Sequence, residues 1–390
     1  MKRLSYVCLF AFLFAIPCNA RNNAEIFDAL SNNIKLTELK SANTAAIQQL
    51  KEENSLSGPE AEFEHLWSKT GERKWNFGIS QNFEWPGIYS VRSQKIKHTL
   101  AINKYIEDAE LLSLKLEAAS LMTQLYFNRQ KVQVLDKIIE TLTEFAENLS
   151  TGVDHGLVTI LDLKKAQIES TTLKIERDLL IDNKLTLISE LQQLVGENFN
   201  LDNFQWDTLP LFTSLKTLDS YLTDADSDPS ILASEAMNRL AELNAKEIKA
   251  STLPGFNIGY RLEREDGALF NGFGVSINLP TWNVRQKRLS AESFISSASS
   301  QSLAQKSLYK TRITGEYRNA FILRDRISEL NKSGVDGSYL GLLKEALDGG
   351  ELSILDFLRE QAYFKEQSLS MIELQERYQL LLNSLHRYEF

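Results

Sequence analysis

The phrase GLVTILDL occupies residues 156–163, and the phrase GELSILDF occupies residues 350–357, 194 positions later. Each phrase begins with glycine and carries a hydroxyl residue three positions before an aspartate. The pairs Thr159 with Asp162 and Ser353 with Asp356 therefore fit the capping box that starts a helix. The repetition predicts two equivalent turns, each followed by a helix, in a chain built from two copies.

The prolines show nearly the same spacing. Pro59 and Pro254 are 195 positions apart, and Pro86 and Pro280 are 194 positions apart. Proline is tolerated where a strand begins or ends, because no ladder hydrogen bond is lost there. We therefore predict a tandem repeat of about 194 residues. Each copy is expected to hold one β-hairpin between its prolines, at about 59–86 and about 254–280.

The first proline-free stretch, residues 87–209, permits long helices. Apolar residues recur at spacings of three, four or seven from Tyr89 to about Ser150, and the pattern resumes from Ile160 to about Val195. This periodicity is typical of one face of a helix. The two helices are expected to form a long hairpin over about 88–196.

The second proline-free stretch, residues 281–390, repeats this plan. Its polar segment NKSGVDGS, residues 331–338, has no equivalent in the first copy. A second helical hairpin is expected over about 284–386. Its helices are expected to run from Val284 to about Leu330, then to about Leu347, and finally from about Ile354 to Leu385.

Sequence of period two precedes each helical hairpin. Apolar and polar residues alternate in PEAEFEHLW (59–67), KWNFGISQNF (74–83), FNIGYRLE (256–263) and GFGVSINLP (272–280). Such alternation predicts strands with one apolar and one polar face. Glu60, Glu62 and Glu64 fall on the polar face. The apolar row comprises Phe63, Trp75, Phe77, Ile79, Phe256, Ile258, Phe273, Val275 and Ile277.

Residues 1–20 have the pattern of a secretory signal peptide, with a basic head, an apolar run and a small-residue end. We expect cleavage after Ala20, and the alternative is a lipid attached to Cys18. Both cysteines, Cys8 and Cys18, lie in this segment. Disulfides and cysteine metal sites are therefore not expected in the mature chain.

Charge and composition exclude several function classes. The whole chain has a net charge of −9, and loss of Lys2 and Arg3 with the leader makes it −11. We therefore expect no nucleic-acid partner. No run of about 18 apolar residues follows the leader, so no membrane-spanning helix is expected.

The sequence predicts neither a metal site nor a catalytic site. Glu62, Glu64 and His65 are neighbours, but alternation puts the histidine on the opposite face from the glutamates, so an acidic row on the polar face is the better interpretation. No phosphate-binding loop or nucleophile elbow is present. We expect no enzyme activity and no cofactor.

Four strands cannot close a membrane barrel, because bacterial barrels of this kind have at least about eight strands. A trimer would supply twelve strands and leave no free edge. Trp67 and Trp75 flank the first strand turn, and Trp85 and Trp282 lie at the other strand ends, as paired aromatic girdles require. The alternative is one face of a soluble β-sandwich.

The chain resembles the TolC family of outer-membrane efflux proteins. The features that carry the resemblance are the leader, the duplicated strand pairs and helical hairpins, the segment FGISQNFEWPG with its counterpart FGVSINLPTW, and the two opening phrases. The resemblance covers essentially the whole mature chain. It implies a mainly α fold with a small membrane β part, in which a trimeric 12-stranded β-barrel continues into an α-helical periplasmic tunnel. The predicted organisation is a signal peptide at 1–20, a first repeat at 21–203 and a second repeat at 204–390, each repeat with a helical lead-in before its β-hairpin and helical hairpin.

The resemblance also implies two kinds of site. The hairpin tips would contact a periplasmic adaptor protein, and the alternative is that their glycines only make turns. Asp356 and Asp162 would face the pore near its closed end, and the alternative is that they only cap helices. Some family members latch this end with a basic residue at the position of Leu352, so closure here is expected to depend on packing instead. The tip residues are Gly156, Leu157, Val158, Gly350, Glu351 and Leu352.

The implied function is that of a passive channel-tunnel in a tripartite efflux system, exporting metal cations or small drugs. Its implied partners are two further copies of the chain, a periplasmic adaptor (membrane fusion) protein, outer-membrane lipid and an inner-membrane pump of the RND type or, alternatively, the ABC type. The location would be the bacterial outer membrane, with a helical extension in the periplasm. Alternative functions are a periplasmic adaptor or structural coiled-coil protein, and the outer-membrane duct of type I protein secretion.

Overall fold

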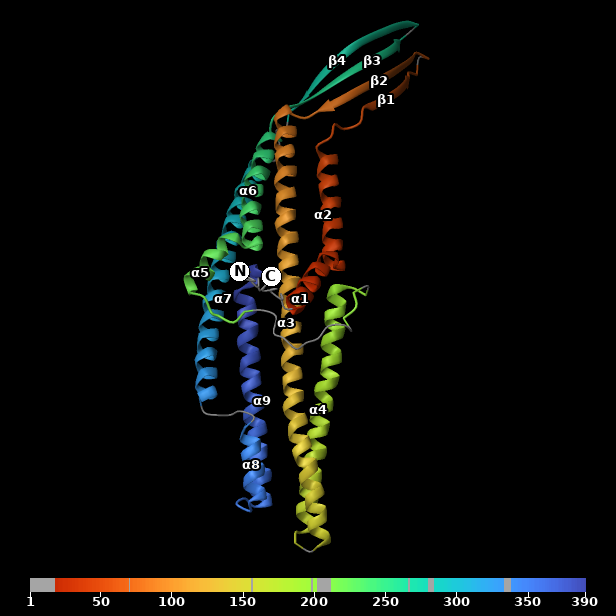
Figure 1. Ribbon diagram of the computed structural model, residues 1–390. Coiled ribbons are helices and arrows are strands. Elements are labelled where there is room, and N and C mark those ends of the chain that lie inside the picture. Colours follow the sequence, from red (N-terminus) through yellow and green to blue (C-terminus); the bar gives the residue numbers. More distant parts are fainter. Residues whose placement is uncertain are drawn as a thin grey trace, which may run out of the picture. The chain divides into compact units, whose positions relative to one another are not determined.

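The computed structural model describes residues 18–69, 71–155, 157–197, 199–201, 212–265, 267–279, 284–332 and 338–390. The chain is mainly helical and has one small antiparallel sheet, which is the fold class predicted from the sequence (Figure 1). The helices are α1 (Cys18–Ala29), α2 (Ile34–Glu53), α3 (Pro86–Asp154), α4 (Ile160–Val195), α5 (Leu218–Thr223), α6 (Pro229–Ala250), α7 (Val284–Lys332), α8 (Ser338–Asp348) and α9 (Ile354–Leu385). The strands are β1 (Glu60–Trp67), β2 (Arg73–Phe83), β3 (Gly255–Glu265) and β4 (Ala268–Asn278).

Several predicted features lie outside the described residues. They include Gly156, Pro280, Trp282 and most of the polar interruption between α7 and α8. The predicted leader also lies outside them, except for residues 18–20, which form the first turn of α1.

The helices follow the apolar periodicity closely. α4 and α9 begin and end at the residues that the periodicity predicted. α3 has 69 residues and begins at Pro86, earlier than the Tyr89 predicted. Proline suits the first turn of a helix, because its fixed φ is helical and the N–H that it lacks has no partner there.

None of the helices within the described ranges is long and apolar enough to cross a membrane.

The chain forms two compact units that differ from the two sequence copies. Unit 1 comprises residues 1–34, 111–218 and 313–390, and unit 2 comprises residues 35–110 and 219–312. Each unit therefore combines segments from both halves of the sequence. α3 and α7 supply residues to both units because they are long and continuous. The division into copies at 21–203 and 204–390 remains a prediction about the sequence.

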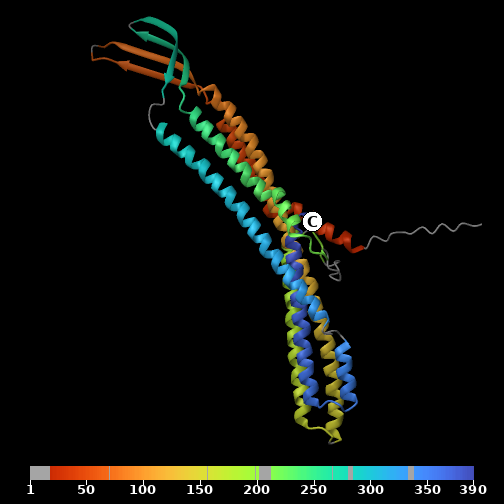
Figure 2. The same cartoon turned by 90° about the vertical axis from the view of Figure 1, so that its left-hand side faces the viewer.

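The sheet belongs to unit 2 and has the order β1-β2-β3-β4. In Figures 1 and 2 the hairpin β1–β2 lies beside the hairpin β3–β4, and β2 pairs antiparallel with β3. Phe77 is opposite Phe63 on one side and Leu262 on the other, and Tyr260 is opposite Ile79 and Phe273. Because side chains alternate between the two faces, this register places the whole predicted apolar row on one face.

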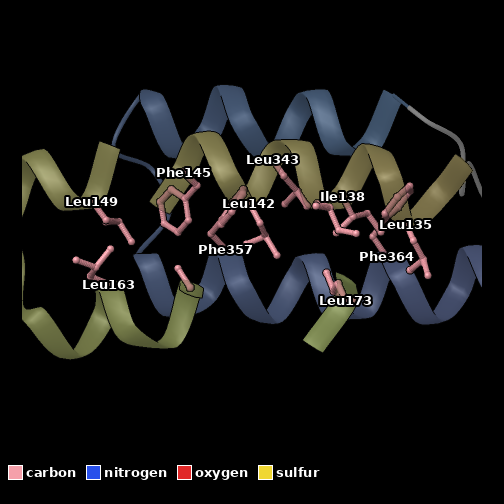
Figure 3. Packing of buried hydrophobic residues seen from close by; sticks show 12 residues of the cluster. Leu135, Ile138, Leu142, Phe145, Leu149, Leu163, Leu173, Leu343, Phe357 and Phe364 are labelled. Atoms are coloured by element: carbon pink, nitrogen blue, oxygen red, sulfur yellow. The ribbon is translucent and has the colours of Figure 1, made fainter. Parts of the chain in front are cut away.

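A buried apolar cluster joins α3, α4, α8 and α9 in unit 1 (Figure 3). The Phe145 ring lies 4.8 Å from the Phe357 ring, and Phe357 is 1% exposed. Leu142 and Leu173 are also almost completely buried in this cluster. Burial of apolar surface is the main favourable force in packing helices together.

Candidate functional site

The turn between α3 and α4 presents one exposed apolar residue. The Leu157 N–H donates to the Gly152 carbonyl over 2.8 Å, and the Leu157 side chain is 80% exposed. Val158 instead packs against the buried cluster. A Cβ atom at Gly152 would lie 2.6 Å from Val158, so a side chain there would collide with the folded turn. Gly156, the remaining predicted residue of this tip, lies outside the described residues.

The turn between α8 and α9 has an equivalent backbone. The Glu351 N–H donates to the Ala346 carbonyl over 2.9 Å, and the Gly350 N–H donates to the Leu347 carbonyl over 3.0 Å. Gly350 has a φ of 72°, so these two bonds form a Schellman motif with glycine in the left-handed region. Glu351 is exposed, whereas Leu352 packs against the buried cluster. In each tip, therefore, the first residue after glycine faces solvent and the second faces the core.

The two aspartates have the same geometry at the starts of α4 and α9. The Thr159 hydroxyl accepts the Asp162 N–H over 3.2 Å and donates to the Asp162 carboxylate over 2.6 Å. The Ser353 hydroxyl makes the same two bonds with Asp356, also at 3.2 and 2.6 Å. These contacts are those of a helix N-cap. Both carboxylates also retain accessible surface, with side-chain exposures of 26% for Asp162 and 49% for Asp356.

A nearby cation accompanies each carboxylate. Lys165 lies 3.6 Å from Asp162, and Arg359 lies 3.3 Å from Asp356. The hydrogen bond from Thr159 lowers the pKa of Asp162, desolvation opposes it, and Lys165 adds to the lowering, so that the net shift is downward. Asp162 is therefore ionised at neutral pH.

The polar face of the sheet carries basic as well as acidic residues. Lys74 pairs with Glu263 and lies 3.6 Å from Glu265, and Arg261 lies 3.9 Å from Glu62. The acidic row was predicted from alternation on one strand. The closeness of Arg261 to Glu62 was not predicted, because it depends on how β1 pairs with β2 and how β2 pairs with β3.

Unit 2 also contains an ion-pair network next to the strands. Arg92 of α3 donates to Glu247 of α6 over 2.8 Å, to the Glu53 carbonyl of α2 over 3.0 Å, and to Glu84, which follows β2. Lys95 donates to Glu247 over 2.5 Å. Burial acts to raise the pKa of Glu247, but the bonds from Lys95 and Arg92 outweigh it and lower that pKa. This network links α3 to α6, to the end of α2 and to the segment after β2. No sequence signal indicated it, because Arg92 and Glu247 are 155 positions apart.

The two tips share their supporting core. The α9 residue Phe357 and the α4 residue Leu163 both pack in the cluster with Phe145 and Leu149 of α3 (Figure 3). Lys344 of α8 also pairs with Glu144 of α3 over 2.6 Å. No group of three potential metal-ligating side chains occurs in the part of the chain that the structure describes.

Comparisons with known proteins identify the fold. No protein-family profile matches the chain, and no curated protein matches its sequence. Among solved structures, the outer-membrane channel OprN has a TM-score of 0.76 at 14% identity, with 94% of this chain and 89% of that chain covered. The outer membrane protein VceC from Vibrio cholerae has a TM-score of 0.74 at 14% identity, with coverages of 94% and 95%.

A third structure agrees with these two. The Campylobacter jejuni CmeC outer membrane channel has a TM-score of 0.72 at 16% identity, with 94% of this chain and 85% of that chain covered. The matches extend over nearly the whole of each chain. The chain therefore has the fold of the outer-membrane channel proteins OprN, VceC and CmeC.

Proposed function

We propose that the chain is the outer-membrane duct of a tripartite efflux system, a passive channel and not an enzyme. The observation that carries the proposal is the four-stranded sheet, which has one exposed apolar face and two edges that no other described strand pairs with. The fold shared with outer-membrane channels supports the same function.

The apolar face of the sheet fits a lipid environment. Phe63 is 69% exposed, Phe273 85% and Val275 72%. Contiguous exposed apolar surface is rare on monomers in water and marks a surface that something covers. Acyl chains would cover this face without leaving backbone groups unpaired, provided that the edges of the sheet are closed by further strands.

The free edges of β1 and β4 fit closure by two further copies. Among the described residues each of these strands pairs on one side only. Unpaired edges are templates for aggregation, and closing a barrel abolishes them. Neighbouring strands alternate in direction, so β4 of one copy meets β1 of the next in the antiparallel sense. Three copies give twelve strands, an even number above the minimum of about eight.

The height of the sheet matches a membrane. β2 has 11 residues, which span about 34 Å along the strand. At the tilt of about 40° that is usual in membrane barrels, the strand rises about 26 Å, close to the outward apolar band of about 25 Å. The polar face, with Glu62 and Arg261, would line the water-filled interior.

The helices fit a tunnel built from several copies. On α4, Leu161, Ile168 and Ile175 are 63%, 65% and 59% exposed and are spaced by seven residues. An apolar stripe of this period forms a seam for a neighbouring helix. In the proposed homotrimer this seam packs against another copy, and the helical part extends into the periplasm as a tunnel.

The two tips would meet the partners. Leu157 and Glu351, with the adjoining glycines Gly156 and Gly350, offer an adaptor protein two chemically different contacts per chain. The adaptor would connect the duct to an inner-membrane pump of the RND or ABC type, which supplies the energy and selects metal cations or small drugs. The leader at residues 1–20 accounts for export across the inner membrane.

Asp356 and Asp162 are the proposed pore residues at the closed end. Threefold symmetry turns each carboxylate into a ring, and such rings favour cations. Leu352 stands at the position where a latch residue would be basic, and it packs against the buried cluster. Closure of the pore would therefore depend on apolar packing.

Purification and planar-bilayer recording test the duct directly. We expect the full chain in detergent to have the mass of a trimer and to conduct ions after insertion. Recovery of the mature chain as a soluble periplasmic monomer that does not conduct would contradict the duct and favour the adaptor or structural coiled-coil function.

Three variants separate the gate role of Asp356 from its cap role. Asp356→Asn should lower the permeability of cations relative to anions, whereas Ser353→Ala removes the cap hydroxyl and leaves the carboxylate in place. Asp162→Asn reports on the equivalent residue of the first copy. If Asp356→Asn changes only the stability, as Ser353→Ala does, Asp356 is a cap and not a gate.

A further inference from the structure

The apolar face of the sheet carries two arginines near its turns. Arg73 begins β2 and is opposite Trp67, and Arg264 of β3 is opposite Trp75. Arg73 lies two positions from Trp75 on the same strand, so the two arginines are diagonal neighbours on one face. Diagonal positions in a sheet have Cα atoms about 7–8 Å apart, within reach of long side chains.

These arginines differ from the basic residues of the opposite face. Lys74 pairs with Glu263 and lies near Glu265 of the neighbouring strand β3, and Arg261 lies 3.9 Å from Glu62 of β1, two strands away. Arg73 and Arg264 are exposed, and neither forms an ion pair with any residue in the described ranges. Within the described ranges, therefore, the two guanidinium groups have no carboxylate partner on the face where apolar residues predominate.

Their position along the strands matches the margin of the membrane band. Arg73 and Phe83 are the two ends of β2, which rises about 26 Å at the usual tilt, and the apolar band is about 25 Å tall. Tryptophan concentrates at this margin, and Trp67 and Trp75 are the neighbours of the two arginines. Arginine strongly destabilises a barrel at the bilayer centre and costs little at the interface. Headgroup level is therefore the depth that both residue types favour.

Phosphate is the chemical group that fits two unpaired guanidinium groups at this depth. The planar guanidinium binds phosphate oxygens through two parallel hydrogen bonds, and two such groups side by side can share one phosphate. We propose that Arg73 and Arg264 bind the phosphate of an anionic lipid headgroup in the leaflet that faces the exterior. This inference rests on the proposed function, which places the strand turns at the outer surface.

The test uses the full chain, purified as the trimer in detergent, with lipid A as the probe. The variant Arg73→Gln/Arg264→Gln removes both outward cations. The matched control Lys74→Gln/Arg261→Gln removes two cations from the same strands on the opposite face. Binding of lipid A, and of lipid A stripped of its phosphates, is measured by native mass spectrometry for each protein.

We expect the outward variant to bind lipid A about 25-fold more weakly, about five-fold for each arginine, since a basic residue at an anionic lipid surface contributes about 1 kcal/mol. The control variant should bind like the parent, and dephosphorylated lipid A should bind all proteins equally weakly. Equal binding by the outward variant and the parent would overturn the inference, as would an equal loss in the control variant.

Conductance of the same preparations separates this inference from the proposed function. Proteins that form conducting trimers but show unchanged lipid A binding in the outward variant would overturn the lipid contact alone. A parent chain that neither forms trimers nor conducts would overturn the duct and, with it, this inference.

Discussion

The two helix tips share a turn hydrogen bond and a helix cap but have different surfaces. Both close with a hydrogen bond from the first residue after glycine to the carbonyl five residues earlier, and both start the next helix with a hydroxyl and an aspartate. At the solvent-facing position, however, the first tip has Leu157 and the second has Glu351.

The difference shows at which positions the local fold limits the choice of residue. Glycine allows the backbone of the turn, and the hydroxyl and the aspartate cap the next helix, so these residue types occur at both tips. A residue that only meets solvent is under no such requirement and is available to a partner. The following predictions test this separation of structural from surface positions.

The largest effect is expected in the core behind the tips. Phe357 of the second tip corresponds to Leu163 of the first, and they are 1% and 7% exposed. Phe357→Ala should lower the free energy of unfolding by about 3–5 kcal/mol, and Leu163→Ala by an amount near the lower end of about 2–5 kcal/mol. Urea unfolding followed by circular dichroism measures both, and an equal or larger loss in Leu163→Ala would contradict the ranking.

A smaller effect is expected for the glycine of the second turn. Gly350 has a φ of 72°, where a side chain is strained by about 1–2 kcal/mol, so Gly350→Ala should lower the free energy of unfolding by that amount. Gly341→Ala is the matched control. It adds a Cβ in open space within α8 and should stabilise the helix by up to about 1 kcal/mol. An equal loss of stability in both variants would contradict a specific role for the backbone conformation of Gly350.

The next effect is a pH dependence at the first tip. The bond from Thr159 lowers the pKa of Asp162 below its value in the unfolded chain, which is about 3.9. The stabilisation by the ionised carboxylate is therefore fully present above that value and is lost as the pH falls through the lower folded pKa. Asp162→Asn should reduce stability at neutral pH and match the parent in strong acid. The melting temperatures of the parent and of Asp162→Asn, measured from neutral pH to strong acid, test this. An equal difference at every pH would show that the ionised Asp162 carboxylate does not stabilise the cap.

The smallest effect on stability is expected at the surface position. Leu157→Glu gives the first tip the residue of the second, and because Leu157 is 80% exposed the free energy of unfolding should change by less than about 0.5 kcal/mol. The reciprocal variant Glu351→Leu should behave in the same way. A loss of more than about 1 kcal/mol in either variant would mean that the position has a structural role.

Much of the architecture could be predicted from the sequence, because local signals dominate it. The bounds of α4 and α9 follow from capping residues and apolar period, and the strands follow from alternation over uninterrupted runs. The start of α3 was placed too late, because Pro86 was assigned only to the end of the hairpin although it also serves as a first helical residue.

The candidate sites could be predicted only in part. Asp162 and Asp356 were recognised from their spacing, and their cap geometry is local. The Arg92 network, the ion pairs of Lys74 and the free arginines were not recognised, since each depends on which distant segments become neighbours.

The sequence by itself determined the elements and the apolar or polar character of each face, because these depend on residues a few positions apart. Only the tertiary structure decided the register between β2 and β3, the sharing of one core by both tips, and the division into units that cut across the two copies. The physical reason is that the pairing of two strands about 180 positions apart depends on how whole faces of the sheet pack. No single residue of either strand indicates that pairing.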